Sequence, residues 1–312
     1  AKSVQLGSGL EKTGKLSRDS MNRTIQALKV CKQKLDKYDV KYSRLIATEA
    51  CRRAKNSKDF ILKVFQETGL KLNIIDTEEE ARLAVISCAP LVSSKSEQLL
   101  VVDIGGGSTE LVWIDLSAVP SHERPKSIMR LHSGFHSIES PFPAARVVDW
   151  ISVPLGVATL RDQFNDVEDD AARFALMSWY FEEKLTDFAP YKDNKIDTSF
   201  QIIGTSGTVT TVASSHLGLR RYDRTKVDGL RMTTDQIDKV IRSYLEMGPD
   251  GRKKDPRIGR DRQALIMSGS AILQAMLRSW PTDKLTVADR GLREGLLYAQ
   301  MSANGVLEDV IL

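Results

Sequence analysis

The stretch LLVVDIGGGSTELVWID, residues 99–115, decides the fold prediction for this chain. Its apolar ends predict two strands, residues 99–103 and 111–114, which a glycine-rich turn joins. Three consecutive glycines allow the backbone to turn sharply and to bring several N–H groups against an anion without obstruction by side chains. The turn is therefore a candidate phosphate-binding site.

Hydroxyl and carboxyl side chains flank the glycines. Asp103 at the end of the first strand and Glu110 beyond the turn are placed to hold a hard cation such as Mg²⁺, which would offset the repulsion between carboxylate and phosphate. An ordinary glycine-rich hairpin is the alternative, but acid, glycines, hydroxyls and acid occur together directly after an apolar strand. The candidate phosphate-binding residues of the turn are Gly105, Gly106, Gly107, Ser108 and Thr109.

A second glycine-containing loop follows a strand predicted at residues 201–203. It leads into a helix that we expect to begin near Thr208, and the exposed N–H groups and positive dipole end of such a helix favour phosphate. A purely structural turn is the alternative. The candidate phosphate-binding residues of this loop are Gly204, Thr205, Ser206, Gly207 and Thr208.

Helices and strands alternate ahead of the first turn, which indicates an α/β fold. Ser17 can cap a helix, and Gly69 can end another. We expect strands at 42–48 and 72–75, helices at 59–68 and from Thr77 to near Pro90, and then a second domain. In that domain we expect an irregular segment at 116–148, a strand at 146–153, and helices at 169–186, 233–247, 262–280 and 291–303. The predicted domains are residues 1–90 and 98–312.

The composition is that of a globular protein of 312 residues, 41% of them hydrophobic, which can bury a substantial core. No apolar stretch approaches the roughly 18 residues of a membrane span, and no signal peptide core opens the chain, so we expect a cytoplasmic protein. Cys31, Cys51 and Cys88 are too few and too widely spaced for a disulfide framework and read as buried small residues. The densest basic stretch, residues 251–262, reads as a solvated loop rather than a polyanion-binding rim, and no nucleic-acid-binding motif accompanies it.

Six ordered stretches resemble the exopolyphosphatase and guanosine pentaphosphate phosphatase (Ppx/GppA) family of the actin-like ATPase superfold, in its short form. They are ATEACRRAKN (47–56), IIDTEEEARLA (74–84), VVDIGGGSTELV (101–112), VPLGVATL (153–160), IIGTSGTVTT (202–211) and ADRGLREGLL (288–297). The resemblance implies two α/β domains of ribonuclease H-like fold, with a cleft between them that holds phosphates and Mg²⁺. The family's first phosphate motif, approximately Asp-x-Gly-Thr/Ser-Asn-Ser, is missing from this chain, so we expect the first domain to be amino-terminally incomplete.

The resemblance also assigns a catalytic residue. In the family the glutamate immediately before the Ala-Arg of an EEAR motif activates the attacking water, which here is Glu80, with Glu79 as the adjacent alternative. A competing interpretation is a capping box, because Thr77 and Glu80 have the Thr-x-x-Glu spacing. Arg52, with Arg53 as its alternate, is either a phosphate clamp or a surface arginine of a helix. Further candidates for binding phosphate are Arg262 and Arg293.

The resulting hypothesis is a Mg²⁺-dependent phosphohydrolase that releases orthophosphate from the end of inorganic polyphosphate or from guanosine pentaphosphate. One alternative is a non-catalytic sensor of guanosine tetra- or pentaphosphate. A sugar or acetate kinase of the same superfold fits less well, since no acceptor motif is evident. The expected partners are the phosphorylated ligand and, from the resemblance, a second copy in a homodimer, with no nucleic acid and no membrane.

Overall fold

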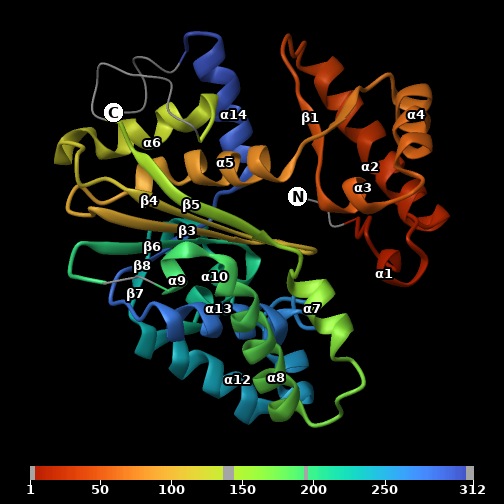
Figure 1. Cartoon of the computed structure of the whole chain (residues 1–312). Helices are drawn as coiled ribbons and strands as arrows, with labels where there is room; N and C mark the ends of the chain where they lie inside the picture. The colour runs from red at the N-terminus through yellow and green to blue at the C-terminus, as the bar shows by residue number, and fades with distance from the viewer. Residues whose placement is uncertain (1–3, 136–143, 193–195, 307–312) are drawn as a thin grey trace. The chain divides into compact units, whose positions relative to one another are not determined.

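The computed structural model describes residues 4–135, 144–192 and 196–306, and its contacts divide the chain into two compact units, Ala1–Glu80 and Ala81–Leu312 (Figure 1). The division falls inside helix α5 (Thr77–Ser87), whereas the predicted domains were separated between residues 90 and 98. The second half of α5 therefore belongs to the core of the larger unit, where Leu83 and Ile86 are fully buried.

The smaller unit is an α/β unit with a two-stranded parallel sheet, in which Leu45 pairs with Leu72. The predicted caps are confirmed: the Ser20 N–H donates to the Ser17 hydroxyl at 3.2 Å, and Gly69 ends a helix with φ of 70°. The strands are shorter than predicted. The elements are α1 (Leu10–Thr13), α2 (Arg18–Lys37), β1 (Leu45–Ala47), α3 (Glu49–Arg53), α4 (Ser57–Thr68) and β2 (Leu72–Ile74).

The larger unit is built on a six-stranded mixed sheet with the order β5-β4-β3-β6-β8-β7. The hairpin β3–β4 continues antiparallel into β5, while β3, β6 and β8 are parallel. The carboxyl ends of parallel strands meet at one edge of a sheet, which is where ligands bind in open α/β folds. The strands are β3 (Gln98–Ile104), β4 (Thr109–Asp115), β5 (Arg146–Val153), β6 (Phe200–Thr205), β7 (Arg231–Met232) and β8 (Leu285–Ala288).

Helices cover both faces of this sheet. Figure 1 shows α6 (Arg124–Arg130) and α14 (Leu292–Ala303) on one face, and α8 (Asp170–Glu183), α10 (Gly207–His216), α12 (Thr234–Lys254) and α13 (Ile266–Ser279) on the other. Trp113 stacks on Phe200 with ring centroids 4.9 Å apart, and Trp280 approaches Trp113 at 6.0 Å. These rings join the sheet to the helices on the second face. The remaining short elements are α7 (Val157–Gln163), α9 (Ala189–Lys192), α11 (Arg224–Val227) and the 3₁₀ turns Ala89–Leu91, Ser121–Glu123, Leu131–Ser133 and Lys184–Asp187.

Two sequence expectations are wrong in this unit or its neighbour. The segment predicted as irregular contains α6. Arg124 at the start of this helix is buried and fixes it by donating to the carbonyls of Val119 and Ser94 at 3.2 and 2.7 Å. Residues 136–143 of that segment lie outside the described part. Cys51 and Cys88 are buried as expected, but Cys31 is exposed on α2. Burial raises the pKa of Cys51 to about 11 and that of Cys88 to about 12.

None of the helices in the described part of the chain is both long enough and apolar enough to cross a lipid bilayer.

Candidate active site

The glycine turn closes the hairpin between β3 and β4. The Gly105 N–H donates to the Ser108 carbonyl at 2.9 Å, and a Cβ atom on Gly105 would lie 2.8 Å from that oxygen. Asp103 and Glu110 pair directly across the two strands, so their side chains emerge on the same face of the sheet. The acidic pair thus stands at the base of the turn.

Helix α7, which the sequence did not predict, begins against this turn. The N–H groups of Val157 and Ala158 donate to the carbonyls of Gly105 and Gly106, each at 2.9 Å. A Cβ atom on Gly156 would lie 2.5 Å from the Gly105 carbonyl oxygen, so only glycine permits this approach. The glycine of VPLGVATL was the available signal, but the seven residues of α7 are too few for a clear helical period.

The bonds from α7 fix the direction of the amides in the turn. A trans peptide places its N–H opposite the C=O of the same peptide unit, so the N–H groups of Gly106 and Gly107 point away from α7. Neither amide donates to any acceptor in the described part of the chain. The turn therefore presents two successive N–H groups that can bind an anion.

The hydroxyls beside these glycines are buried. The Thr109 hydroxyl donates to the Leu155 carbonyl at 2.8 Å, and Ser108 is only 3% exposed. Thr109 therefore holds the segment that leads into α7, a structural contact that sequence reasoning did not foresee. The backbone amides, more than these hydroxyls, are the groups that the turn offers to a ligand.

Asp103 and Glu110 are the candidate donor set for Mg²⁺. Glu110 is buried and accepts a hydrogen bond from the Ser152 hydroxyl at 2.9 Å, while Asp103 is half-buried. Among the described residues, no group of three or more His, Cys, Asp or Glu side chains could hold a metal ion. Mg²⁺ commonly binds through one or two carboxylates and takes its remaining oxygens from water and phosphate, so the pair fits this ion.

The second loop uses its hydroxyls to support itself. Ser206 caps α10, its hydroxyl accepting from the N–H groups of Thr208 and Val209 at 3.1 and 3.2 Å. The Thr205 hydroxyl donates to the Arg290 carbonyl. Ser206 has φ of 153°, a conformation that non-glycine residues rarely adopt and that often marks a functional site. The Gly207 amide at the start of α10 has no acceptor among the described residues.

An arginine occupies the space that Gly207 leaves open. A Cβ atom on Gly207 would lie 0.8 Å from Nη1 of Arg262, so the guanidinium group rests directly on the first turn of α10. Arg262 is exposed, and within the described ranges its side chain has neither a carboxylate partner nor a hydrogen-bond acceptor. A predicted phosphate-binding arginine and a predicted phosphate-binding loop are therefore in contact.

A pocket of about 210 Å³ gathers these groups at the carboxyl ends of β3, β6 and β8. Arg293, in the first turn of α14, is exposed and has no ionic partner within the described ranges, whereas Arg290 is paired with Asp228. Two unpaired guanidinium groups thus line a pocket that Asp103 also borders. The lining residues are Asp103, Thr205, Ser206, Gly207, Thr210, Arg262, Ala288, Asp289, Arg290, Gly291, Leu292, Arg293 and Glu294.

The smaller unit holds the predicted catalytic glutamate in a network of charges. Oε2 of Glu80 lies 2.7 Å from Nη2 of Arg52, which also contacts Oε2 of Glu49 at 3.0 Å. Glu80 is 9% exposed, and burial raises its pKa, although the Arg52 hydrogen bond and charge oppose the change. A carboxylate with a raised pKa is a better proton acceptor than an ordinary one.

The cap of α5 distinguishes Glu80 from its neighbour. The Asp76 carboxylate accepts from the Glu79 N–H at 2.7 Å, so Asp76 caps the helix and the proposed Thr77–Glu80 capping box is wrong. Oε1 of Glu79 pairs with Nη2 of Arg44 at 2.7 Å instead. Glu80 is therefore not needed at the helix end.

Arg52 is not the surface arginine of the alternative interpretation. Its side chain is 16% exposed, and besides its carboxylate partners it donates to the Ile75 carbonyl at 3.0 Å. Arg53 is more exposed and lies 3.7 Å from Oε1 of Glu49. In this structure Arg52 holds Glu80 in place and favours the charged form of its carboxylate. Binding of phosphate by Arg52 stays a prediction.

A model of the Ppx/GppA phosphatase family matches residues 1–304. The bifunctional 3-dehydroquinate synthase/phosphatase of Fusobacterium nucleatum is 26% identical over 306 residues, which cover 92% of this chain and 39% of that protein. The chain therefore spans about two fifths of the length of this curated relative.

Solved structures resemble the whole described fold. The Aquifex aeolicus member of the Ppx/GppA protein family is 30% identical, with a TM-score of 0.72 over 96% of this chain and 87% of that chain. An exopolyphosphatase from Cytophaga hutchinsonii, 21% identical, shares the fold with a TM-score of 0.78 over 97% of this chain and 88% of that chain. The predicted fold class, α/β with two ribonuclease H-like domains of the actin-like ATPase superfold, is confirmed.

Proposed function

The chain belongs to the Ppx/GppA phosphatase family, and from this premise we propose that it is a Mg²⁺-dependent phosphohydrolase. It would release orthophosphate from the end of inorganic polyphosphate or from the terminal position of guanosine pentaphosphate. Both substrates end in phosphates joined by anhydride bonds. Their hydrolysis depends mainly on positioning and on stabilising charge, since the protein need form no covalent bond.

The observation that carries this proposal is the pocket at the ends of β3, β6 and β8. There the guanidinium of Arg262 lies on Gly207 and that of Arg293 stands in the first turn of α14. Two cations and the amino end of a helix suit the charge that develops on a departing phosphoryl group. In the neighbouring glycine turn, the amides of Gly106 and Gly107, which have no acceptor among the described residues, add backbone donors.

Glu80 is the proposed base. Its carboxylate would orient a water molecule and accept a proton as the oxygen attacks the terminal phosphorus. Burial keeps the pKa of this carboxyl raised, and Arg52 holds the group in one orientation. Asp103 and Glu110 would hold Mg²⁺, which when bound neutralises part of the phosphate charge.

Release of orthophosphate tests the proposal. We expect turnover of long-chain polyphosphate or guanosine pentaphosphate with Mg²⁺, none with EDTA, and a loss of 10²- to 10⁴-fold in Glu80→Gln, the range typical of general bases. Glu79→Gln is the matched control, because that carboxylate pairs with Arg44 at the start of the same helix.

Equal turnover in Glu80→Gln and Glu79→Gln would remove Glu80 from the mechanism. Tight binding of guanosine pentaphosphate without any orthophosphate release over hours would indicate a non-catalytic sensor and contradict the hydrolase assignment.

A further inference from the structure

A single guanidinium group serves two carboxylates in the smaller unit. Nη2 of Arg52 lies 2.7 Å from Oε2 of Glu80 and donates to Oε2 of Glu49 at 3.0 Å. Because both oxygens contact one nitrogen, the two carboxylates lie within about 6 Å of each other. Glu80 is the proposed base, whereas Glu49 has no assigned role.

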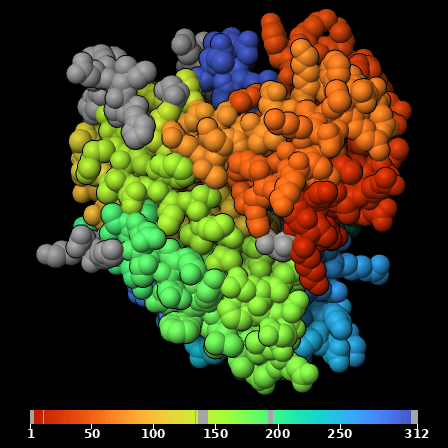
Figure 2. Space-filling model, turned by 45° about the vertical axis from the view of Figure 1, so that its right-hand side comes forward, coloured from red at the N-terminus to blue at the C-terminus, as the bar shows by residue number. Residues whose placement is uncertain are grey.

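The three side chains are shielded from water. Most charged side chains of the smaller unit are exposed on its surface, which is coloured red to orange in Figure 2. The side chains of Arg52, Glu49 and Glu80 are only 16%, 17% and 11% exposed. Charges act on one another more strongly where water is largely excluded, so each of these groups influences the other two.

Helix α3 places Glu49 and Arg52 side by side. The two residues are three positions apart, a spacing at which side chains of a helix meet. Arg53 approaches the other oxygen of Glu49, Oε1, at 3.7 Å. The guanidinium of Arg52 is fixed further because its Nη1 donates to the Ile75 carbonyl at 3.0 Å. Arg52 is therefore held between Glu49 and Glu80.

Other polar groups of the smaller unit also lie near Glu80. The Thr48 hydroxyl does not cap α3 and hydrogen-bonds with the Glu80 carboxylate instead. On the helix of Glu80, the Asp76 carboxylate accepts from the Glu79 N–H, and the Glu79 carboxylate pairs with Arg44. Within this unit, the charges that act directly on the Glu80 carboxylate are therefore those of α3, one positive and one negative.

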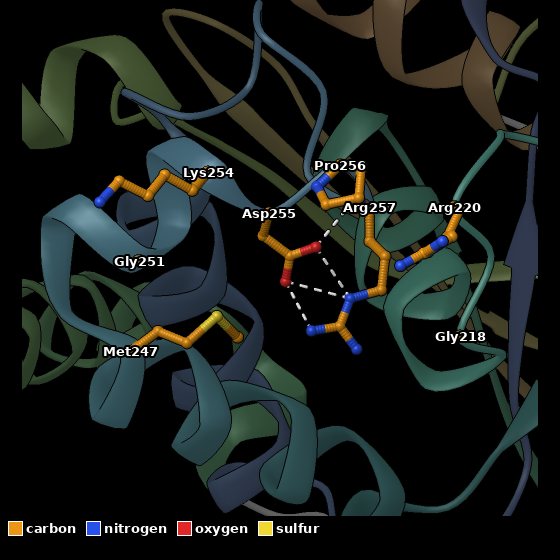
Figure 3. Close-up of a pocket in the computed structure, with 8 residues that line it drawn as sticks. All are labelled: Gly218, Arg220, Met247, Gly251, Lys254, Asp255, Pro256 and Arg257. Carbon is orange, nitrogen blue, oxygen red and sulfur yellow. Dashed lines mark hydrogen bonds and ion pairs between the residues drawn. The ribbon is translucent and has the colours of Figure 1, made fainter.

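Elsewhere in the chain, firmly bound arginines serve one carboxylate each. Figure 3 shows Asp255 bound by Nε and Nη2 of Arg257, with both carboxylate oxygens engaged. The Asp255 side chain is also largely buried, at 6% exposed. Arg252 binds Asp170 in the same way, through two nitrogens at 2.8 and 2.7 Å. Arg52 differs from these arginines because it divides its charge between two partners.

The two arrangements accompany opposite changes in acidity. The hydrogen bonds from Arg257 lower the pKa of Asp255, although burial opposes them. Burial raises the pKa of Glu80, and the negative charge of Glu49 adds to this increase against the influence of Arg52. An arginine with one partner favours the charged, weakly basic form of that carboxylate. A shared arginine leaves the carboxylate better able to accept a proton.

We propose that Glu49 is a positioning residue of the hydrolysis. It takes up part of the charge of Arg52, so that this arginine orients Glu80 while Glu80 keeps its ability to accept a proton from water. The inference rests on the proposed function, in which Glu80 is the base. Glu49 itself receives no proton and acts through Arg52 and through its own negative charge.

The first test is Glu49→Gln, which removes the charge and keeps the shape of the side chain. Arg52 then serves Glu80 alone, and we expect the acidic limb of kcat/KM for orthophosphate release to move to lower pH. Above the limb the rate should fall by less than about tenfold, because the base is weaker but still present. The pH profiles of Glu49→Gln and the wild-type protein should therefore cross.

Three further variants fix the sign of the effect. Arg52→Gln should move the limb to higher pH, and Glu49→Gln/Arg52→Gln should lie between the two single variants, because the opposite charges are removed together. Glu49→Asp keeps the charge, so its limb should lie nearer to that of the wild-type protein than the limb of Glu49→Gln does. Glu67→Gln is the matched control in the same unit, since Glu67 pairs with Lys29 at 2.7 Å, and it should leave the limb unmoved.

Equal slowing of Glu49→Gln at every pH, with the limb unmoved, would assign Glu49 a structural role and overturn the proposal. A movement of its limb to higher pH would also overturn it. The substrate ionises identically with every variant, so its own titration does not affect the comparison. Urea denaturation identifies any loss of rate that comes from unfolding. If Glu49→Gln does not fold, the limb of Glu49→Asp decides, and a limb unmoved or at higher pH contradicts the proposal.

The titration of Glu80 can also be followed without substrate, by NMR of ¹³C-labelled glutamate carboxyl groups, in which Glu80→Gln identifies the resonance. If no substrate releases orthophosphate but this titration moves to lower pH in Glu49→Gln, the hydrolase assignment fails and the influence of Glu49 on Glu80 stands. If orthophosphate is released and depends on Glu80, but Glu80 titrates alike in Glu49→Gln and the wild-type protein, only the role of Glu49 fails.

Discussion

The glycine turn at residues 105–109 and the second loop at residues 204–208 follow adjacent strands of one sheet, yet they satisfy their polar groups in opposite ways. In the turn, amides of α7 bind the carbonyls, and the N–H groups of Gly106 and Gly107 have no acceptor in the described part of the chain. In the second loop, the hydroxyl of Ser206 binds the helix amides, and a cation, Arg262, comes to rest on Gly207. One loop supplies backbone donors, and the other supplies a platform for a side chain.

This difference shows that similar loop sequences can contribute different chemistry. A glycine permits a close approach at each loop. Gly156 lets the backbone before α7 approach the glycine turn, whereas Gly207, in the second loop itself, leaves room for the guanidinium group of Arg262. The hydroxyls of Thr109 and Ser206, which read as phosphate donors in the sequence, bind protein atoms. Substitutions at these positions distinguish structural from ligand-binding roles.

The largest effect is expected for Gly156→Ala. The added methyl group would lie 2.5–2.6 Å from three backbone atoms of residues 105–107, which cannot move without opening the hairpin. We expect the free energy of unfolding to fall by about 3 kcal/mol, the upper end for overpacking, in urea denaturation. Gly106→Ala is the control, since nothing lies within 4 Å of its Cβ position. Equal stability of the two variants would show that α7 does not support the turn.

Gly207→Ala should act on activity rather than on folding. Its methyl group displaces only the flexible end of Arg262, so stability should stay within about 0.5 kcal/mol, while kcat/KM falls about 10²-fold, as for the loss of one transition-state donor. Arg262→Ala should give the same loss, and the double variant should lose no more than either single one. Additive losses would mean that Gly207 acts independently of Arg262.

The buried hydroxyls should affect stability more modestly. Thr109→Val leaves the Leu155 carbonyl without its donor and should cost about 1.5 kcal/mol of unfolding free energy. Ser206→Ala removes a helix cap and should cost about 1 kcal/mol. Thermal or urea unfolding measures both. A rise in KM of more than tenfold at unchanged stability would show that the substituted hydroxyl binds the phosphate of the substrate.

The smallest expected effect is on the pH dependence of the rate, which should depend on Glu80 and on neither loop. Burial raises the pKa of Glu80, so the rate should fall with decreasing pH at values above the ordinary glutamate pKa of about 4.3, because a protonated carboxyl cannot accept a proton from water. Arg52→Gln removes an influence that lowers this pKa, and it should move the acidic limb of kcat/KM to higher pH. Ser206→Ala should not move the acidic limb of kcat/KM. An equal displacement of the limb in Ser206→Ala would show that the limb does not report the titration of Glu80.

Sequence reasoning succeeded where the signal is local. Ser17 and Gly69 were read correctly because a cap and a left-handed glycine depend on a few neighbouring residues, and the strand at 146–153 coincides with β5. It failed for α7 and β8, which are too short to show a period, and for the cap of α5, where Asp76 binds the helix amide in place of Thr77.

The candidate site was predictable as a set of residues but not as an arrangement. Arg262 and Gly207 were both proposed to bind phosphate, yet nothing local indicates that one rests on the other. The buried pairing of Arg252 with Asp170 likewise joins segments far apart in the chain, although most of residues 251–262 are exposed, as the sequence indicated. Contacts of this kind depend on tertiary packing, which overrides local pattern.

The strand order has a consequence for how the molecule assembles. The meander β3–β4–β5 joins neighbouring strands, whereas β3 pairs with β6 across about one hundred positions, from Gln98 to Phe200, and β8 comes later still. During synthesis the hairpin can form before the strands that complete its surroundings leave the ribosome. A nascent chain therefore carries the glycine turn for some time before residues 288–294 arrive to build the pocket, and its apolar edge at β3 needs protection from aggregation during that interval.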